Sequence, residues 1–375
     1  MFLTQPSPPL MSKSLYKSTL EFLNSHSEQP PEGNHKRRIQ ILAGMISSCM
    51  ESKSSSLDGL SSSDIDNNIQ SESRIKQVKR WISSKWTDWE CFFAPYIKIL
   101  LKKLAIKGEL ILVIDGSETA GDCVTLMLSV IWGKYAIPLT WLTKKGEKGH
   151  FPEDWHVDLI DLAASVIPSD CRVVLLGDGE FDGQKLRAKC KGLKWEFVLR
   201  TSTDRKVDCG GEIANLGDLY PINGSDIVFI EDAAQGDNAI LWCGKGYEKP
   251  IPLLTNMDLG EMACRYYKKR FKIELLFKQL KSAGYNVHKS KVQGAEKVRN
   301  LIIIIALAFI FTFCIGLLIL KQDKKVLNKL VRASRIQHIS PLNIALKAFR
   351  KDFDLVIDFF SNISKNWEAL FFSQG

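Results

Sequence analysis

The fold is decided by the stretch ELILVIDGSETAGDCVTLMLSVIWGKYAIPLTWL, residues 109–142. It opens with a short apolar run, Glu109 to Ile114, which is rich in Ile, Leu and Val and is typical of a buried strand. Two more strands are predicted over Cys123 to Trp132 and Ala136 to Leu142, with a turn at Gly133 between them. The stretch therefore predicts three consecutive strands of one sheet.

Helices and strands alternate after this stretch. Asp154 to Val166 and Asp182 to Cys190 have helical patterns, while Arg172 to Leu176 and Trp195 to Arg200 are short apolar strands. The predicted order is strand, strand, strand, helix, strand, helix, strand. That order is typical of the ribonuclease-H-like fold, an α/β fold in which a mixed sheet has helices on both faces.

The rest of the chain differs in composition from this α/β core. Residues 204–256 are rich in Gly and Asp and contain short strand-like runs, so they predict a β-rich insertion. The regions before and after the core have helical patterns. The predicted parts are a basic helical region over 1–105, the core over 106–203 and 257–320, the insertion over 204–256, and a C-terminal helical region over 321–375.

The composition is that of a basic globular protein. Of its 375 residues 45% are hydrophobic, and 51 Lys and Arg against 42 Asp and Glu give a net charge of +9. A positive balance favours a polyanionic partner, either nucleic acid or an anionic membrane surface. The nine cysteines are scattered without a Cys-x-x-Cys pair, which argues against a disulfide framework or a zinc site. With no apolar segment of a signal peptide at the N-terminus, we expect a cytoplasmic protein with reduced thiols.

Two aspartates follow predicted strands. Asp115 comes directly after the first strand, and Asp178 follows the fourth with Gly177 between. Ligands of α/β sheets bind beyond the carboxyl ends of the strands, so the two side chains can face each other if their strands are neighbours. Paired carboxylates suit Mg²⁺ and phosphoryl transfer. Turn formation or helix capping is the alternative for each aspartate, and Glu180 and Asp182 are alternative ligands that also suit a helix start.

A third carboxylate lies on a helix predicted over Leu259 to Ala283. At about 100° per residue, Tyr267, Arg270, Glu274 and Lys281 fall within about 60° of one another, beside an apolar face that packs on the core. The stripe combines a carboxylate for a metal with two cations and a phenol for phosphates. The alternative is a solvated face with ion pairs such as Arg270–Glu274.

These residues resemble a known family. The segments Leu-Val-Ile-Asp-Gly-Ser around Asp115 and Gly-Asp-Gly-Glu-Phe around Asp178 are similar to the first two catalytic blocks of bacterial insertion-sequence transposases of the DDE type. The resemblance covers roughly residues 75–320 and points to the IS-four-like group. The Tyr-Arg-Glu-Lys signature of that group is matched, at its spacing, by Tyr267, Arg270, Glu274 and Lys281.

The resemblance implies a cut-and-paste DNA transposase. Asp115, Asp178 and Glu274 would hold two Mg²⁺ or Mn²⁺ ions per active site, where water attacks the transposon end and frees a 3′-hydroxyl. In the family this hydroxyl attacks the opposite strand and gives a hairpin, which is reopened before strand transfer into target DNA. Such an enzyme would work in the bacterial cytoplasm, in association with the nucleoid.

The resemblance also implies DNA contacts and partners. Tyr267, Arg270 and Lys281 would contact terminal phosphates and stabilise a flipped base, and Trp242 of the insertion would stack on that base. Filling the interior of the insertion is the other role open to Trp242. The expected partners are transposon-end DNA with its terminal inverted repeats, target DNA, and a second copy of the chain, paired through the C-terminal region as a homodimer in a synaptic complex.

A basic helix is predicted over residues 73–83. Ile75, Val78 and Ile82 form one apolar face, and cations occupy much of the remaining surface. We expect this helix to bind the terminal repeats through DNA phosphates, with a charged, solvated surface as the alternative. The cations are Arg74, Lys76, Lys79 and Arg80.

The run from Leu301 to Leu320 is nearly all apolar and long enough to span a bilayer. It belongs to the same helical region as Glu274, which must face DNA, so we expect a helix buried on the sheet and no membrane partner. Two other functions stay open: a ribonuclease-H-like nuclease without strand transfer, and a membrane-anchored or purely DNA-binding protein whose carboxylates are incidental.

Overall fold

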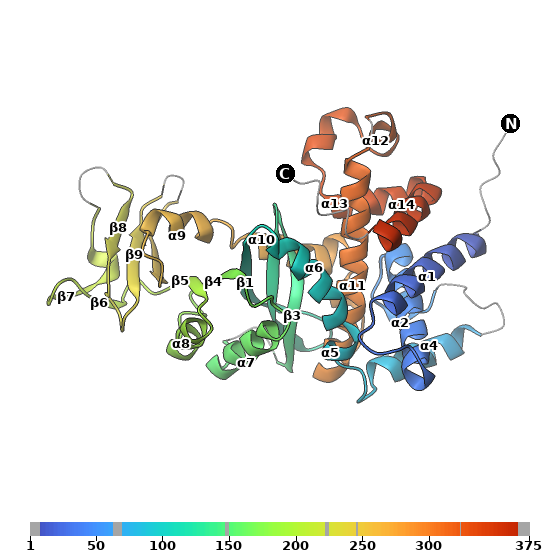
Figure 1. Cartoon of the computed structure of the whole chain (residues 1–375), viewed down its shortest axis with the longest axis horizontal. Coiled ribbons are helices and arrows are strands. Elements are labelled where there is room, and N and C mark those ends of the chain that lie inside the picture. The colour runs from blue at the N-terminus through green and yellow to red at the C-terminus, as the bar shows by residue number, and fades with distance from the viewer. Residues whose placement is uncertain are drawn as a thin grey trace.

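A mixed sheet of eight strands lies at the centre of the protein (Figure 1). The computed structural model describes residues 8–62, 70–146, 150–221, 225–244, 247–322 and 324–366. The strand order is β3-β2-β1-β4-β5-β10-β9-β8, and β6 and β7 form a separate pair. The strands are β1 (Glu109–Glu118), β2 (Cys123–Trp132), β3 (Tyr135–Lys145), β4 (Arg172–Gly177), β5 (Glu196–Arg200), β6 (Lys206–Asp208), β7 (Ile213–Asn215), β8 (Ile227–Ile230), β9 (Asn238–Trp242) and β10 (Ile251–Thr255).

The predicted ribonuclease-H-like arrangement is confirmed. Strands β1, β2 and β3 form an antiparallel meander, while β1, β4 and β5 are parallel neighbours. The two helices expected between those parallel strands are α7 (Glu153–Ala164) and α8 (Gln184–Gly192). Strand β2 is buried along almost its whole length, which explains why its sequence is apolar apart from Thr125 and Ser129 rather than alternating.

The predicted insertion is built into the edge of the same sheet. Strand β10 pairs with β5, β9 with β10, and β8 with β9, all antiparallel. Only the short β6–β7 pair stands apart from the main sheet in the described part of this region. Figure 1 shows this end of the sheet projecting away from the helical regions.

Helices from both ends of the chain pack around one long helix, α11 (Ala295–Leu320). Phe311 of α11 makes edge contacts with Phe22 near the N-terminus and Phe360 near the C-terminus. The two flanking regions therefore form a single helical body (Figure 1). Its other helices are α1 (Pro8–Ser25), α2 (Gly33–Ser52), α3 (Leu57–Leu60), α4 (Ser71–Ile82), α5 (Trp89–Phe92), α6 (Ala94–Ala105), α12 (Lys324–Leu330), the 3₁₀ turn η4 (Ala333–His338), α13 (Pro341–Lys351) and α14 (Phe353–Asn366).

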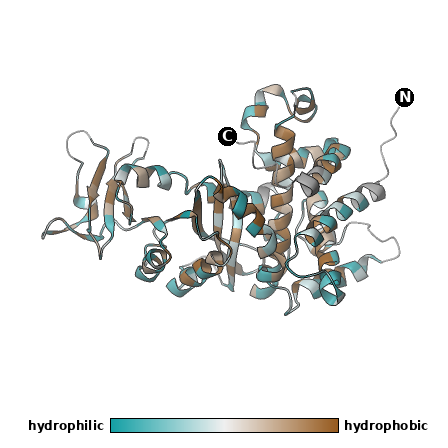
Figure 2. Cartoon of the chain, in the orientation of Figure 1, coloured by the Kyte–Doolittle hydropathy of each residue, from teal (hydrophilic) through white to brown (hydrophobic). Residues whose placement is uncertain are grey.

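Helix α11 is the apolar run of the sequence, and it is buried. Among the described residues it is the one helix with the length and hydropathy to span a membrane, yet 94% of its most apolar window is inside the protein. It packs on β3, where the Trp141 indole donates to the Arg299 carbonyl at 3.0 Å, and on α2, α13 and α14. In Figure 2 the ribbon of α11 is mostly brown, the colour of hydrophobic residues, and it lies between the sheet and the flanking helices. The expected buried helix thus joins the sheet to the helical body.

The helix predicted over Leu259 to Ala283 is broken. Helix α9 (Gly260–Tyr267) ends in a tight turn, α10 (Lys272–Lys278) follows, and a π-helical turn, η2 (Gln279–Ala283), completes the segment. In the turn, successive N–H groups bond three residues back, as from Arg270 to the Tyr267 carbonyl at 2.9 Å. This overwinding changes which side chains share a face, so the four-residue stripe of an ideal helix is not kept. Two further 3₁₀ turns are η1 (Leu216–Asp218) and η3 (Val287–Lys289).

Candidate active site

The two strand-end aspartates lie on neighbouring parallel strands. The register pairs Val113 of β1 with Leu176 of β4, and two further residues along each strand bring Asp115 level with Asp178. Adjacent strands are about 4.8 Å apart, so both carboxylates occupy one small region at the carboxyl edge of the sheet. Asp115 is still within β1, because its pairing with Met127 of β2 continues beyond the end of β4.

Two glycines next to the aspartates, Gly116 and Gly177, leave no room for larger residues. A Cβ atom on Gly116 would lie 2.7 Å from the Phe151 ring, and one on Gly177 would lie 2.8 Å from Cβ of Phe181. Beside the aspartates is a cavity of about 250 Å³, whose lining includes Ser117, Phe151 and Glu180. The glycines therefore serve the close packing that shapes this cavity.

The surroundings of Asp115 disfavour the charged form of its carboxyl group. Burial, and then the charge of Asp178, raise its pKa to about 6, although the Gly116 N–H donates to Oδ1 at 2.7 Å and Arg270 lowers the pKa. Glu274 contributes a smaller repulsion of the same sign. The ionised carboxylates thus repel one another, and a bound cation would relieve that repulsion.

In the presence of a chelator at pH 8, we expect Asp115→Asn to have a free energy of unfolding about 3 kcal/mol higher than that of wild type. The folded pKa lies above the unfolded value, so the native state binds the proton more tightly, and this contribution is lost as pH rises through about 6. The two proteins should converge below pH 4. Urea unfolding between pH 4 and 8 measures this difference, and a constant gap over that range would contradict the assignment.

Arg270 links the third carboxylate to the first. Its Nη2 lies 2.9 Å from Oε1 of Glu274, and its Nη1 lies 3.9 Å from Oδ2 of Asp115. The Arg270 side chain is 8% exposed and Glu274 54% exposed. The Nε of Arg270 is buried without a hydrogen-bond partner among the described residues, so the guanidinium has an unused donor inside the site.

The donor set suits a hard divalent cation. Mg²⁺ and Mn²⁺ prefer carboxylate oxygens, and the Asp115–Asp178 pair supplies them side by side. Within the described ranges, no group of three or more His, Cys, Asp or Glu is close enough to hold a metal ion. Glu274 is held by Arg270 instead of joining the aspartates.

The two alternative ligands have structural roles. Glu180 accepts from the Phe151 N–H at 2.5 Å and so fixes the segment that borders the cavity. Asp182 accepts from the Thr201 hydroxyl at 2.5 Å and is paired with Arg205. Neither carboxylate is directed at the Asp115–Asp178 pair by these contacts.

The remaining members of the predicted stripe separate. Tyr267 is 1% exposed. Burial raises the pKa of its phenol, nearby Arg270 lowers it, and Asp178 raises it, so the phenol lies in the wall of the site close to both side chains. Lys281, on the π turn, borders a different small apolar cavity beside Glu118. Arg270, Glu274 and Tyr267 therefore lie around the aspartates, and Lys281 lies elsewhere.

Trp242 is packed within the sheet edge. It is 4% exposed, its ring meets Tyr247 at 5.0 Å between centroids, and Lys268 Nζ lies 5.0 Å above it. In this conformation the ring fills the interior of the insertion, the alternative considered from the sequence, and offers no face to a base.

The basic helix α4 has the orientation expected of it. Val78 and Ile82 are buried against the helical body, which leaves the cations on the outer side. Lys76, Lys79 and Arg80 are exposed, and Arg74 is half-buried. The surface is available to DNA phosphates.

Sequence reasoning missed a histidine beneath the Asp178 loop. His156 of α7 is 2% exposed, and its ring lies 4.8 Å from that of Phe181. Neither ring nitrogen has a hydrogen-bond partner among the described residues, and burial lowers the pKa of His156 to about 4. The neutral His156 ring packs against Phe181 and supports it. The sequence could not predict this role, because a single histidine in a helical pattern does not show what it packs against.

One family model matches part of the chain, and one solved structure is similar to it over most of its length. Residues 157–311 match the family model described as "Transposase DDE domain", a range that includes Asp178 and Glu274 but not Asp115. Among solved structures, a cryo-EM structure of a piggyBac transposase synaptic complex with hairpin DNA is similar at 13% identity. The similarity covers 97% of this chain and 82% of that one, with a TM-score of 0.45. No curated protein sequence matches the chain.

Proposed function

We propose that this chain is a metal-dependent DNA transposase that works by a cut-and-paste reaction; its residues 157–311 match the model of a transposase DDE domain. In the proposed reaction it cuts DNA at the ends of a bacterial transposable element and transfers those ends into target DNA. The observation that carries the proposal is the register that sets Asp115 beside Asp178, with Glu274 tied to the same place through Arg270.

Asp115, Asp178 and Glu274 would hold the metal, and two Mg²⁺ or Mn²⁺ ions are proposed. Bound there, the ions would activate water or a 3′-hydroxyl and stabilise the leaving oxygen. The chain's own contribution is to place two carboxylates side by side, keep them partly buried, and bring the third on a helix that meets the sheet. For Glu274 to join the aspartates, Arg270 must release it.

Arg270 is proposed to exchange its carboxylates for a DNA phosphate. Its planar guanidinium suits a phosphate, and its unused Nε supplies one more donor. Tyr267 lies close to it and would restrict where it can go. Lys281, farther along the segment, is proposed to contact the backbone of the same DNA.

We expect Arg270→Ala to bind Mn²⁺ more tightly than wild type without DNA, by about tenfold, because a competing cation is removed from the carboxylates. Cutting of DNA should nevertheless fall by about a hundredfold, because a phosphate contact is lost. Metal titration followed by calorimetry, and a cleavage assay, measure the two effects. Arg265→Ala is the matched control, since Arg265 is exposed and contacts Glu261; weaker metal binding by Arg270→Ala would contradict the exchange.

The hairpin step is part of the proposal. Trp242 is buried, so it would have to leave its place beneath Lys268 to stack on a flipped base. The same class of reaction implies three partners. They are target DNA, a second copy of the chain paired through the C-terminal region, and the terminal repeats, which would be bound by Arg74, Lys76, Lys79 and Arg80. A cytoplasmic, nucleoid-associated location goes with it.

The test is cleavage of a duplex that carries the element's terminal repeat and its flanking DNA. Mg²⁺-dependent cuts at the repeat, followed by joining to a second duplex, would support transposition. Cutting without joining would favour a nuclease that lacks strand transfer. A product that migrates as a hairpin on a denaturing gel would support the proposed intermediate.

A further inference from the structure

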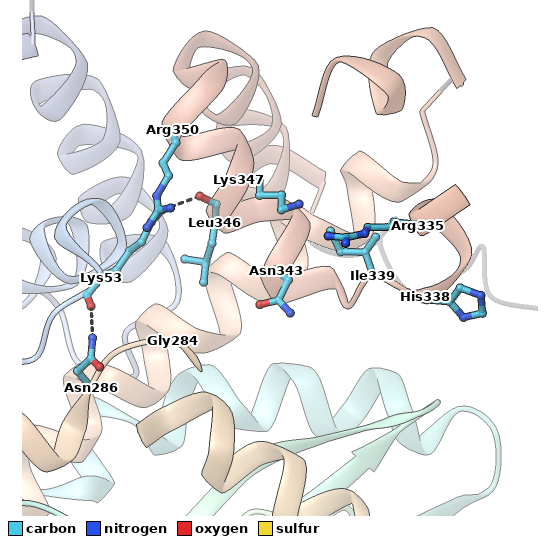
Figure 3. A pocket seen from close by; sticks show the side chains of 10 residues that line it. All are labelled: Lys53, Gly284, Asn286, Arg335, His338, Ile339, Asn343, Leu346, Lys347 and Arg350. Carbon is cyan, nitrogen blue, oxygen red and sulfur yellow. Dashed lines mark hydrogen bonds between the residues drawn. The ribbon is translucent and has the colours of Figure 1, made fainter. Parts of the chain in front are cut away.

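A basic cavity lies on the helical side of the protein, apart from the carboxylates. Its volume is about 650 Å³, and Figure 3 shows its lining from three parts of the chain. Lys53 follows helix α2, Asn286 follows the π turn η2, and the rest comes from η4 and α13. Its cationic lining residues are Lys53, Arg335, Lys347 and Arg350, and His338 lies beside them.

One face of α13 is directed at this cavity. Asn343, Leu346, Lys347 and Arg350 are spaced as i, i+3, i+4 and i+7, which places them on one side of the helix. The opposite side of α13 packs on α11 through residues such as Ile344 and Ala348. The position of the cations is therefore fixed by the same packing that buries α11.

The positive charge of the cavity is uncompensated. In the described part of the chain no carboxylate lines it, and none of its four Lys and Arg residues is ion-paired with an Asp or Glu. Burial and nearby Arg350 lower the pKa of Lys53 to about 8, so the cations repel one another. Like charges gathered in a cavity call for an anion.

Lys53 is held inward by unusual backbone geometry. Lys53 and Asn286 both have positive φ, 56° and 55°, which non-glycine residues seldom adopt. The Asn286 amide donates to the Lys53 carbonyl at 3.4 Å, and Lys53 Nζ donates to the Leu346 carbonyl at 2.6 Å (Figure 3). These two hydrogen bonds keep the Lys53 ammonium at the cavity wall and join the segment after η2 to α13.

We propose that this cavity binds the sugar-phosphate backbone of duplex DNA. Arginines and lysines from separate elements suit a run of phosphates, and the absence of acidic lining residues favours a polyanion. The chain leads there from the active site, since Gly284 and Asn286 follow the turn that carries Lys281. This proposal rests on the proposed function for one point, the choice of DNA as the polyanion. It adds a DNA contact at a cavity whose lining does not include the three carboxylates.

The test is the salt dependence of duplex binding by Lys347→Ala combined with Arg350→Ala. Because two phosphate contacts are removed, the slope of log K against log salt should decrease by about 2, with affinity for a random-sequence duplex about tenfold or more weaker at low salt. The control is Lys325→Ala with Lys329→Ala, which removes the same charge from exposed positions on α12. It should leave the slope within about 0.5 of wild type.

A charge-retaining variant, Lys347→Arg with Arg350→Lys, should keep the wild-type slope and so separates lost charge from lost folding. Equal slopes for wild type and the alanine pair would overturn the proposal. So would saturation of the cavity by inorganic phosphate, seen in calorimetry, without any change in duplex binding. Cutting of element ends is measured on the same wild-type preparation, so a failure of the proposed function is seen separately from a failure of this contact.

Discussion

Asp115→Asn, Asp178→Asn and Glu274→Gln should each reduce Mg²⁺-dependent cutting of element ends by roughly a thousandfold or more. Each change removes one negative charge from the proposed metal ligands while keeping the shape of the side chain. Metal-assisted charge stabilisation contributes several kcal/mol, and about 1.4 kcal/mol corresponds to a tenfold change in rate. The measurement is single-turnover cleavage of a labelled duplex.

Binding of the uncut duplex should stay within about threefold of wild type for all three variants, because DNA affinity comes mainly from cations. Glu180→Gln is the matched control, since Glu180 lines the same cavity but is engaged by the Phe151 N–H. We expect it to lose far less activity than the three variants. Undiminished cutting by any one of the three would remove that residue from the site.

Gly316→Ala should lower the free energy of unfolding by about 3 kcal/mol or more, or prevent folding. A Cβ at Gly316 of α11 would lie 1.8 Å from the Pro341 carbonyl oxygen and 2.3 Å from its carbon, both backbone atoms that cannot rotate away. Helices α11 and α13 would have to separate, and α11 supports both the sheet and the helical body. Chemical denaturation measures the loss.

Gly192→Ala is the matched control for this change. Gly192 ends helix α8, its Cβ would meet nothing within 4 Å, and its φ is not positive. Alanine there should be neutral or stabilise by up to about 1 kcal/mol. A Gly316→Ala protein as stable as wild type would show that the close approach of α11 to α13 is not as described.

The sheet was predictable because its signals are local. The strands of residues 109–142 and 172–176 are apolar enough to be recognised as buried from their own sequence. Because β1 and β4 are parallel neighbours, Asp115 on β1 lies beside Asp178, which follows β4. The apolar run of α11 was predictable as a helix, but its partners were not. They come from both ends of the chain, and contacts such as Phe311 with Phe22 and Phe360 leave no local pattern.

Two features of the structure differ from the sequence-based predictions, the direction of the side chains from Tyr267 to Lys281 and the burial of Trp242, and both depend on contacts between distant parts of the chain. An ideal helix through Tyr267 and Glu274 ignores the turn in which Arg270 is brought inward to Asp115. The stripe therefore identified residues near the site but misjudged their directions. Burial of Trp242 depends on β9 joining the main sheet through β10, which the composition of the insertion did not reveal.

The proposed metal site is tested most directly by anomalous diffraction from Mn²⁺ bound to crystals of the protein with element-end DNA. We expect peaks about 2.1 Å from carboxylate oxygens of Asp115 and Asp178, with Glu274 as a further ligand and Arg270 moved to a phosphate. Peaks at other residues, or none between the two aspartates while Arg270 still holds Glu274, would contradict the proposed site.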